Sequence, residues 1–301
     1  MRRLLTALAA GLTLAFAVPA RAAELEVVAS FSIIADFARA VGGERVHVTM
    51  LVGPDGDAHV YQPQPADAAA LARADLVLVN GLAFEGFLAR LAEASGGRAR
   101  IATLSEGVET IPMGDGDGHA THGDGNADPH AFQSVPNARI YVRNVAEAFC
   151  AADAQGCGSY RANAAAYDKR LDGLDREIRA AVAQIPPEKR VVITSHDAFG
   201  YLAHEYGITF LAPEGVSTEA EASAADVARL IRQVRDSHAA ALFVENVTDP
   251  RLIEQIGRET GLTVGGTLYS DALSPAGGPA ASYLEMMRHN IATIRGAVLG
   301  S

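Results

Sequence analysis

Three histidines and one aspartate, His59, His130, His196 and Asp271, are the residues of this chain whose types and positions suit a metal site. Three imidazole nitrogens and a carboxylate oxygen form a four-coordinate set that suits Zn²⁺ in tetrahedral geometry. Imidazole also binds copper and nickel, whereas sites made mostly of oxygen ligands favour Mn²⁺, Mg²⁺ or Ca²⁺. The ligand types therefore favour zinc but do not decide the selectivity. A fourth protein ligand would fill the position that a catalytic zinc keeps for water, which favours binding over hydrolysis.

His196 and Asp271 each follow a stretch that is typical of a buried strand. Residues 191–194 form a short β-branched run before a helix predicted from residue 198, and a predicted strand at 262–268 precedes Asp271. Runs of this length and composition indicate strands of a parallel sheet. Ligands of open α/β sheets bind beyond the carboxyl ends of the strands, where these two side chains would stand.

His59 and His130 fall instead in loops of the first half of the chain. His59 ends the turn-rich segment Gly53-Pro-Asp-Gly-Asp-Ala-His59, and His130 ends the tripeptide Asp128-Pro-His130. Two ligands from each half would place the ion in a cleft between two lobes.

The elements that must position these residues alternate between strand and helix. In the first half, strands are predicted at 26–30, 46–52, 76–79 and 99–104, and helices at 32–41 (with Ser32 as N-cap), 65–74, 84–94 and 134–149. In the second half, strands are predicted at 191–194, 208–211, 240–244 and 262–268, and helices at 198–206, 224–236, 250–260 and 283–298. This alternation predicts an α/β fold of two parallel-sheet lobes with helices on both faces.

The longest helical segment, 160–185, predicts a rigid helix that joins the two lobes. Its apolar positions include Tyr167, Leu171, Leu174 and Ile178. The two prolines Pro186 and Pro187 end the helix. A helix of this length would span roughly 39 Å at about 1.5 Å per residue. The predicted division is a first lobe at 23–158, a linking helix at 159–186 and a second lobe at 187–301.

Residues 1–22 have the pattern of a cleaved signal peptide. Arg2 and Arg3 precede an apolar stretch at 4–18, and Ala20-Arg21-Ala22 is a small-residue cleavage site. Cysteine is absent near that junction, so we expect export without a lipid anchor. The composition of 49% apolar and 20% charged residues is that of a globular protein, and the net charge of −11 argues against a nucleic-acid partner.

The two cysteines, Cys150 and Cys157, lie close together in the chain. In an exported protein such a pair predicts a disulfide. The alternative is a pair of thiols in a metal site, although the spacing is not that of a Cys-x-x-Cys motif and no histidine lies beside them.

Six other histidines and one aspartate-rich segment need separate interpretations. The segment 113–128 is rich in Gly, Asp, His and Asn, and we expect a flexible loop in which His119 and His122 form an auxiliary metal-binding pair; a solvated insertion with incidental histidines is the alternative. The remaining four are interpreted as structural, with His204 and His238 on solvated helix faces: His47, His204, His238 and His289.

The chain resembles the zinc/manganese-binding substrate-binding proteins of ABC transporters, the cluster often called A-I, over nearly its whole length after residue 22. The resemblance is carried by GPDGDAH at 53–59, YQPQPAD at 61–67, DPHAF at 128–132, TSHDAFGY at 194–201 and GTLYSDALS at 266–274. It implies His59, His130, His196 and Asp271 as metal ligands and two lobes bridged by a rigid helix. Members that resemble manganese carriers often have glutamate where His196 stands, so the resemblance favours zinc over Mn²⁺, in a zinc type with a short His-containing loop.

The resemblance also implies the partners. We expect a periplasmic monomer that delivers zinc to an inner-membrane ABC permease and receives it from a periplasmic zinc metallochaperone. Two other functions are consistent with the residues: a metal-binding adhesin or buffer without a permease, and a secreted zinc hydrolase. The hydrolase would need a general base, for which Glu245 is the candidate, although Glu245 and Asn246 fit a helix-capping turn better.

Overall fold

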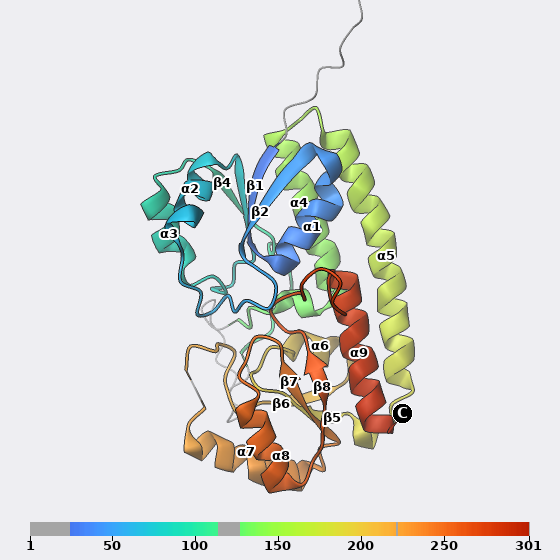
Figure 1. Ribbon diagram of the computed structural model, residues 1–301. Coiled ribbons are helices and arrows are strands. Elements are labelled where there is room, and N and C mark those ends of the chain that lie inside the picture. The colour runs from blue at the N-terminus through green and yellow to red at the C-terminus, as the bar shows by residue number, and fades with distance from the viewer. Residues whose placement is uncertain (1–24, 114–126, 221, 301) are drawn as a thin grey trace, which may run out of the picture.

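The computed structural model describes residues 25–113, 127–220 and 222–300, and two α/β lobes stacked along one axis make up this part of the chain (Figure 1). The predicted signal peptide at 1–22 and the histidines His119 and His122 lie outside the described residues. The two lobes and their parallel sheets confirm the predicted fold class.

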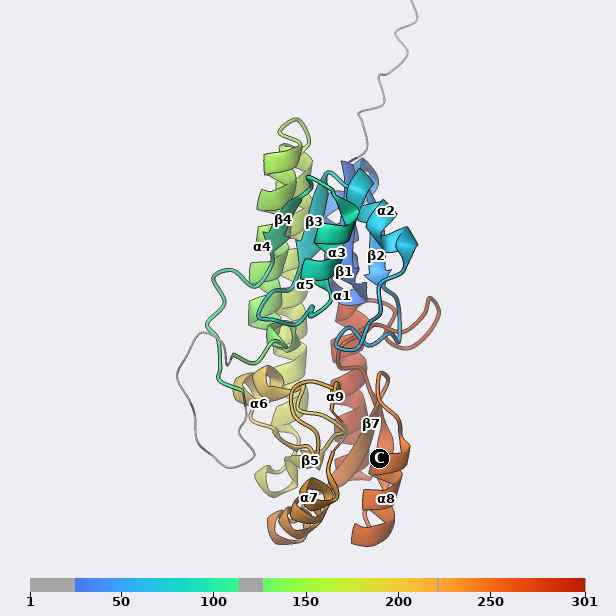
Figure 2. The same cartoon turned by 90° about the vertical axis from the view of Figure 1, so that its left-hand side faces the viewer.

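The first lobe is built on a parallel sheet with strand order β2-β1-β3-β4. Strand β1 is buried at every position except Glu26, as expected of a strand covered on both faces. Helices α1 and α4 cover one face, and α2 and α3 lie on the other (Figures 1 and 2). The bounds are β1 Leu25–Phe31, α1 Ser32–Gly42, β2 Val46–Val52, α2 Pro65–Arg73, β3 Leu76–Val79, α3 Leu88–Ser95, β4 Arg100–Thr103 and α4 Val135–Ala152.

The second lobe repeats this plan with strand order β6-β5-β7-β8. Its central strands β5 and β7 carry the apolar runs VVI and ALFVE, which are almost entirely buried. Helix α9 packs on β7 and β8, and α7 and α8 pack together on the sheet (Figure 1). The bounds are β5 Val191–Ile193, α6 Gly200–Tyr206, β6 Thr209–Leu211, α7 Ala224–Ser237, β7 Ala241–Glu245, α8 Arg251–Thr260, β8 Val264–Leu268 and α9 Tyr283–Leu299.

Helix α5, Cys157–Ala183, runs along the length of both lobes (Figure 1). It packs against α1 and α4 of the first lobe and against α6 and α9 of the second. Its buried residues recur every three or four positions, which gives it one continuous apolar face. The predicted linking helix is therefore confirmed. In the described part of the chain, no helix combines the length and apolar character that crossing a membrane requires.

Two local predictions differ from the structure. Ser32 is not the N-cap of α1: that position is Phe31, and the Ser32 hydroxyl accepts a hydrogen bond from the Leu273 backbone N–H of the second lobe at 2.9 Å. The helix predicted at 84–94 begins only at Leu88. The backbone just before it has positive φ at Gly81, Leu82 and Ala83, a conformation that an α-helix cannot contain.

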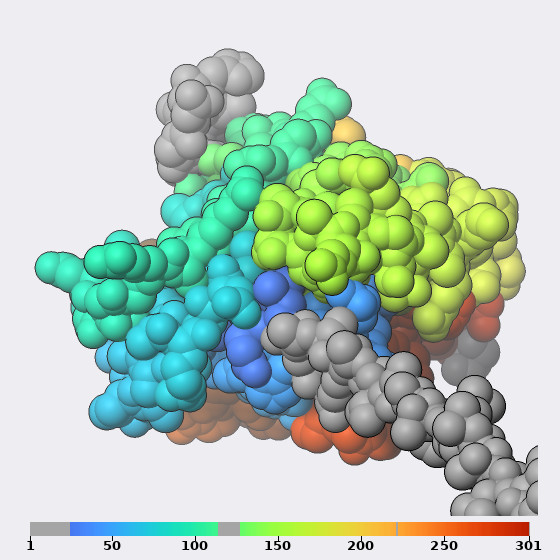
Figure 3. Space-filling model, turned by 90° about the horizontal axis from the view of Figure 1, so that it is seen from above, coloured from blue at the N-terminus to red at the C-terminus, as the bar shows by residue number. Residues whose placement is uncertain are grey.

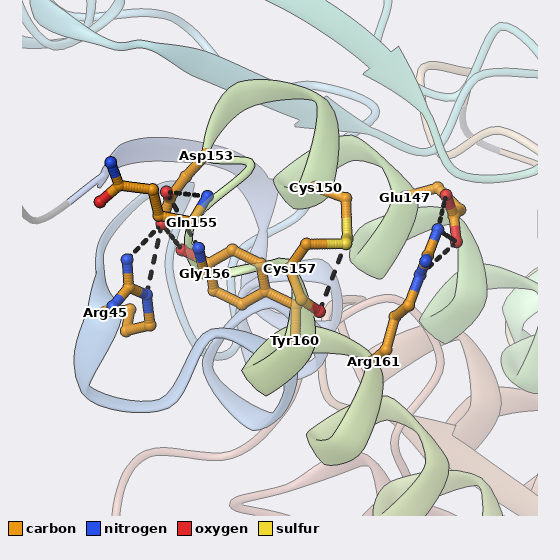
Figure 4. Close-up of a disulfide and its surroundings, with 9 residues drawn as sticks. All are labelled: Arg45, Glu147, Cys150, Asp153, Gln155, Gly156, Cys157, Tyr160 and Arg161. Atoms are coloured by element: carbon orange, nitrogen blue, oxygen red, sulfur yellow. Dashed lines mark hydrogen bonds and ion pairs between the residues drawn. A yellow bond between two sulfur atoms is a disulfide. The ribbon is translucent and has the colours of Figure 1, made fainter.

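The predicted disulfide between Cys150 and Cys157 is present, and it joins the end of α4 to the first residue of α5 (Figure 4). In the same connection, Asp153 accepts hydrogen bonds from Arg45 and from the Tyr160 hydroxyl. The connection lies at the surface at the end of the first lobe (Figure 3). The disulfide therefore fixes the start of the helix that spans both lobes.

Replacing both cysteines by serine should lower the free energy of unfolding by about 2–3 kcal/mol, because a small closed loop restricts the unfolded chain. Metal affinity should not change, since the connection lies at the end of the first lobe away from the second (Figure 1). Urea unfolding of the metal-free protein and a metal titration would test both statements. An unchanged unfolding midpoint would contradict the first.

Candidate metal centre

His59 stands in the loop that follows β2. Its backbone N–H donates to Asp57 Oδ1 at 2.8 Å, in a local turn formed by the aspartate side chain. Its ring lies against the buried ring of Phe84, with centroids 4.8 Å apart. The residue is 8% exposed.

His130 is held more tightly than His59. Both its backbone N–H, at 2.9 Å, and its ring atom Nδ1, at 2.8 Å, contact Asp128 Oδ1. The loop is fixed further by Asn80, whose side-chain amide donates to the Pro129 carbonyl at 2.9 Å. His130 is fully buried, and its Nε2 atom is the nitrogen left to bind a metal.

His196 follows β5, as predicted, and is backed by Glu245 at the end of the neighbouring strand β7. Glu245 Oε1 accepts the backbone N–H groups of Ser195 and His196 at 2.8 and 2.9 Å. Its other oxygen, Oε2, lies 2.7 Å from His196 Nδ1. The carboxylate thus orients the ring and leaves Nε2 as the nitrogen that faces the other ligands, as in the carboxylate–histidine pairs of zinc sites.

The structure brings all four predicted residues together between the lobes, and all four are buried, with one ligand atom from each lying within 4.8 Å of the others. The His59 and His130 Nε2 atoms are 3.3 Å apart. Asp271 Oδ2 lies 3.3 Å from His59 Nε2 and 3.1 Å from His196 Nε2, and Oδ1 lies 3.5 Å from His130 Nε2. Donors on a tetrahedron with bonds of about 2.0–2.1 Å are separated by about 3.3–3.4 Å. The four short separations lie near this value, and the more distant donors, within 4.8 Å, would move closer to complete such a shell around Zn²⁺.

The charges of the site call for a cation. Asp271 is fully buried, and its Oδ1 atom accepts no hydrogen bond from any residue that the structure describes. Burial raises the pKa of Asp271, but His130 and His196 outweigh it and bring the pKa well below its usual range. Burial lowers the pKa of His130, but Asp271 and Asp128 outweigh it and raise the pKa to about 9. Without a metal, protons on the imidazoles are what compensate this carboxylate.

Three residues around the site were not predicted as part of it. Asp128 stands two residues before His130, and a carboxylate so close to a candidate ligand is a local signal. Glu245 was considered only as the base of a hydrolase or as part of a capping turn, but its side chain is buried behind His196 instead. Phe84 packs against the rings of His59 and His130, and its position in a predicted helix concealed this role.

The other described histidines lie outside the site. His47 contacts Glu26 at 2.8 Å on the surface of the first lobe. His204 and His238 are exposed, as predicted, and the His289 ring lies 3.0 Å from the Thr267 carbonyl. The pair His119 and His122 falls outside the described residues, so its auxiliary role stays a prediction.

The family model described as "ZnuA: Zinc-uptake complex component A periplasmic" matches residues 27–297. The chain belongs to this family. It is 35% identical to the manganese-binding lipoprotein MntA of Bacillus subtilis (strain 168), over 91% of this chain and 90% of that protein. It is 32% identical to the iron-binding protein YfeA of Yersinia pestis, over 91% of this chain and 86% of that one.

Solved structures of similar proteins agree with the fold. The periplasmic zinc binding protein TroA from Treponema pallidum has a TM-score of 0.83 at 31% identity, covering 91% of this chain and 99% of that one. The Mn-bound periplasmic metal binding protein from candidatus liberibacter asiaticus has a TM-score of 0.81 at 30% identity, covering 91% and 100%. The chain is thus an extracytoplasmic metal-binding protein that works with an ABC transporter, and its relatives are named for different metals.

Substituting Glu245 by glutamine should lower the metal affinity by about 10–100-fold, the usual effect of changing a residue that orients a ligand. The new amide would donate to His196 Nδ1, which would move the ring proton to Nε2, the atom that faces Asp271 Oδ2. A competition titration against a chelator measures the change. Wild-type affinity in the variant would show that the carboxylate has no part in orienting the ring.

Metal affinity should fall as the pH is lowered. Histidine binds metal only in its neutral form, and the raised pKa of His130 means that the metal must displace a tightly held proton. For each proton displaced, the affinity should fall about tenfold per pH unit. Chelator competition between about pH 6 and pH 8, corrected for protonation of the chelator, would measure this slope, and a flat profile would contradict it.

Proposed function

We propose that the protein captures Zn²⁺ in the periplasm and delivers it to the permease of an ABC transporter, with His59, His130, His196 and Asp271 as the four ligands. The observation that carries this proposal is the set of three imidazole nitrogens and one carboxylate buried between the lobes, with one ligand atom of each within 4.8 Å of the others. Nitrogen-rich four-coordinate sites suit zinc better than manganese, which favours oxygen ligands.

Manganese is the alternative cargo, because several relatives carry that metal in their names. These include MntA of Bacillus subtilis and the manganese ABC transporter substrate-binding lipoprotein PsaA of Streptococcus pneumoniae, which is 29% identical over 90% of this chain. Here the two carboxylates nearest the ligands, Asp128 and Glu245, lie behind imidazole rings. They act through the histidines, so the set that faces the ion remains rich in nitrogen.

A periplasmic location with a cleaved signal peptide at 1–22 belongs to the same proposal. Several relatives are named lipoproteins. In this chain the only cysteines are Cys150 and Cys157, which form the disulfide and leave no thiol for a lipid. We propose a soluble monomer, loaded with zinc by a metallochaperone. An adhesin or metal buffer is the alternative, and neighbouring genes for a permease and an ATPase would speak against it.

The site supports transport better than catalysis. A hydrolytic zinc needs an open coordination position and a base beside it. Glu245, the candidate base, is occupied by two backbone N–H groups and by the His196 ring. Four protein donors around one ion leave a shell suited to holding and releasing it. Assays for zinc-dependent esterase or peptidase turnover of the purified protein would expose a hydrolase.

Metal analysis of protein purified from periplasm, followed by competition between Zn²⁺ and Mn²⁺, tests the cargo. We expect one zinc ion per chain and preference for zinc at equal concentrations. The variant His196→Ala should lose about a hundredfold or more in zinc affinity, since removing a ligand costs more than disturbing the residue behind it. His204→Ala, an exposed histidine on α6, is the matched control and should bind as the wild type does. Equal affinity of His196→Ala and wild type would remove His196 from the shell, and preferential loading with manganese would make manganese the cargo.

A further inference from the structure

His59 differs from the other three residues of the site in how firmly it is held. It is 8% exposed, whereas His130, His196 and Asp271 are 0% exposed. The rings of His130 and His196 are each backed by a carboxylate at Nδ1. Within the described part of the chain, no carboxylate contacts the Nδ1 atom of His59. The solvent side of the site is therefore the side of His59.

What fixes His59 is the carboxylate of Asp57, and this carboxylate also joins the two lobes. Asp57 Oδ1 accepts the His59 backbone N–H at 2.8 Å. Asp57 Oδ2 accepts the hydroxyl of Thr218 at 2.6 Å. Thr218 belongs to the connection between β6 and α7 of the second lobe, which reaches up to the first lobe in Figure 1. A single side chain thus ties the position of His59 to the second lobe.

A pocket of about 400 Å³ adjoins this hydrogen bond, and none of the four ligands lines it. Asp57 and Thr218 line it, together with Glu214, Asp249 and Arg251. The Asp57–Thr218 pair therefore stands between the buried donors and a polar pocket. An ion that leaves past His59 would meet this pocket beside the Asp57 carboxylate, whereas Asp249 in the same pocket is paired with Arg251.

On the opposite side, the lobes are joined by buried contacts close to the helices. Tyr283 of α9 donates its hydroxyl to the Phe132 carbonyl at 2.7 Å, and Gln133 Nε2 donates to the Ser270 carbonyl at 2.6 Å. Both bonds are buried, and α5 packs against both lobes behind them. Opening on this side would expose unpaired polar groups and break helix packing, which makes it costly.

The side-chain hydrogen bonds that close the His59 side are more exposed. Besides Thr218 and Asp57, the contacts of Asp55 join the lobes there: its Oδ1 accepts from Asn246 Nδ2 at 3.0 Å in an exposed position, and its backbone N–H donates to the Leu273 carbonyl at 3.0 Å. Water can replace exposed hydrogen bonds at little cost. The partly buried bond between Thr218 and the charged Asp57 is the stronger closure, because hydrogen bonds to charged groups contribute more than neutral ones.

We propose that the hydrogen bond from Thr218 to Asp57 is a latch that holds the His59 loop against the second lobe and sets the rate at which bound metal is released. The proposal rests on the proposed function and adds its release step. Breaking the latch frees the Asp57 carboxylate, the His59 loop moves away from the second lobe, and the ion leaves on that side. His130, His196 and Asp271 keep their positions during this step.

The variant Thr218→Val tests the latch, because valine keeps the branched shape of threonine and removes only the hydroxyl. The zinc-loaded protein is mixed with excess chromogenic chelator in a stopped-flow instrument, and the dissociation rate is read directly. We expect the variant to release zinc about tenfold faster than the wild type or more, because it loses a hydrogen bond to a charged group. The Co²⁺-loaded variant should keep the wild-type absorption spectrum, since all four ligands remain in place.

Two further variants separate the latch from a general disturbance of the pocket. Thr218→Ser keeps the hydroxyl and should release zinc at nearly the wild-type rate. Thr248→Val removes a hydroxyl of the same pocket that, among the described residues, bonds within its own turn to the Glu245 carbonyl at 3.4 Å. It should also release zinc at the wild-type rate.

The latch is refuted if Thr218→Val releases zinc at the wild-type rate, or if Thr248→Val accelerates release equally. A changed Co²⁺ spectrum in Thr218→Val would also refute it, because the substitution would then act on the ligands. None of these results affects the proposed function, which fails on different evidence: a wild-type protein that binds no zinc. The two failures are therefore distinguishable.

Discussion

The buried carboxylate of Asp271 is the constraint on which the structure around the cleft depends. A carboxylate that is removed from water and faces three imidazoles is costly unless positive charge lies beside it. Protons on the histidines supply that charge in the metal-free state, and a divalent cation supplies it in the loaded state. Metal and protons thus compete for the same compensating position. Asp128 and Glu245 hold two of the rings with Nε2 directed inward, toward that position.

The order of the strands explains how ligands from distant parts of the chain meet at one site. In the second sheet β7 lies between β5 and β8, so Glu245 at the end of β7 stands between His196 after β5 and Asp271 after β8. In the first sheet His59 follows the edge strand β2, and the segment that carries His130 begins after the other edge strand, β4. The central strands β1 and β3 lead into the residues that support the loops, among them Ser32 and Asn80.

The sequence predicts the elements well because their signals are local. Apolar runs, glycines and prolines mark where β2, β3 and α5 begin or end, and the two lobes follow from the alternation. Contacts between distant residues leave no such signal. Serine is a residue type that commonly caps helices, yet the Ser32 hydroxyl accepts a hydrogen bond from the Leu273 backbone N–H in the other lobe. Glu245 could not be placed behind His196 without the order of the second sheet. Residues 84–87 are not helical although the sequence favours a helix there, because the buried Glu85 carboxylate accepts the backbone N–H groups of Asn80 and Gly81 in a turn.

A binding protein must also let its cargo go, and the architecture limits how this can happen. Helix α5 packs against both lobes, so a wide rotation of one lobe against the other would break its apolar contacts. The ligands of the second lobe follow strands of a buried sheet, and His130 is braced by Asp128 and by the loop contact of Asn80. His59 stands on a loop whose contacts with the other lobe are the part-buried bond of Asp57 to Thr218 and the bonds of Asp55. Release through a local movement of that loop leaves the packed core intact, so a rigid two-lobe frame and a releasable ion are compatible.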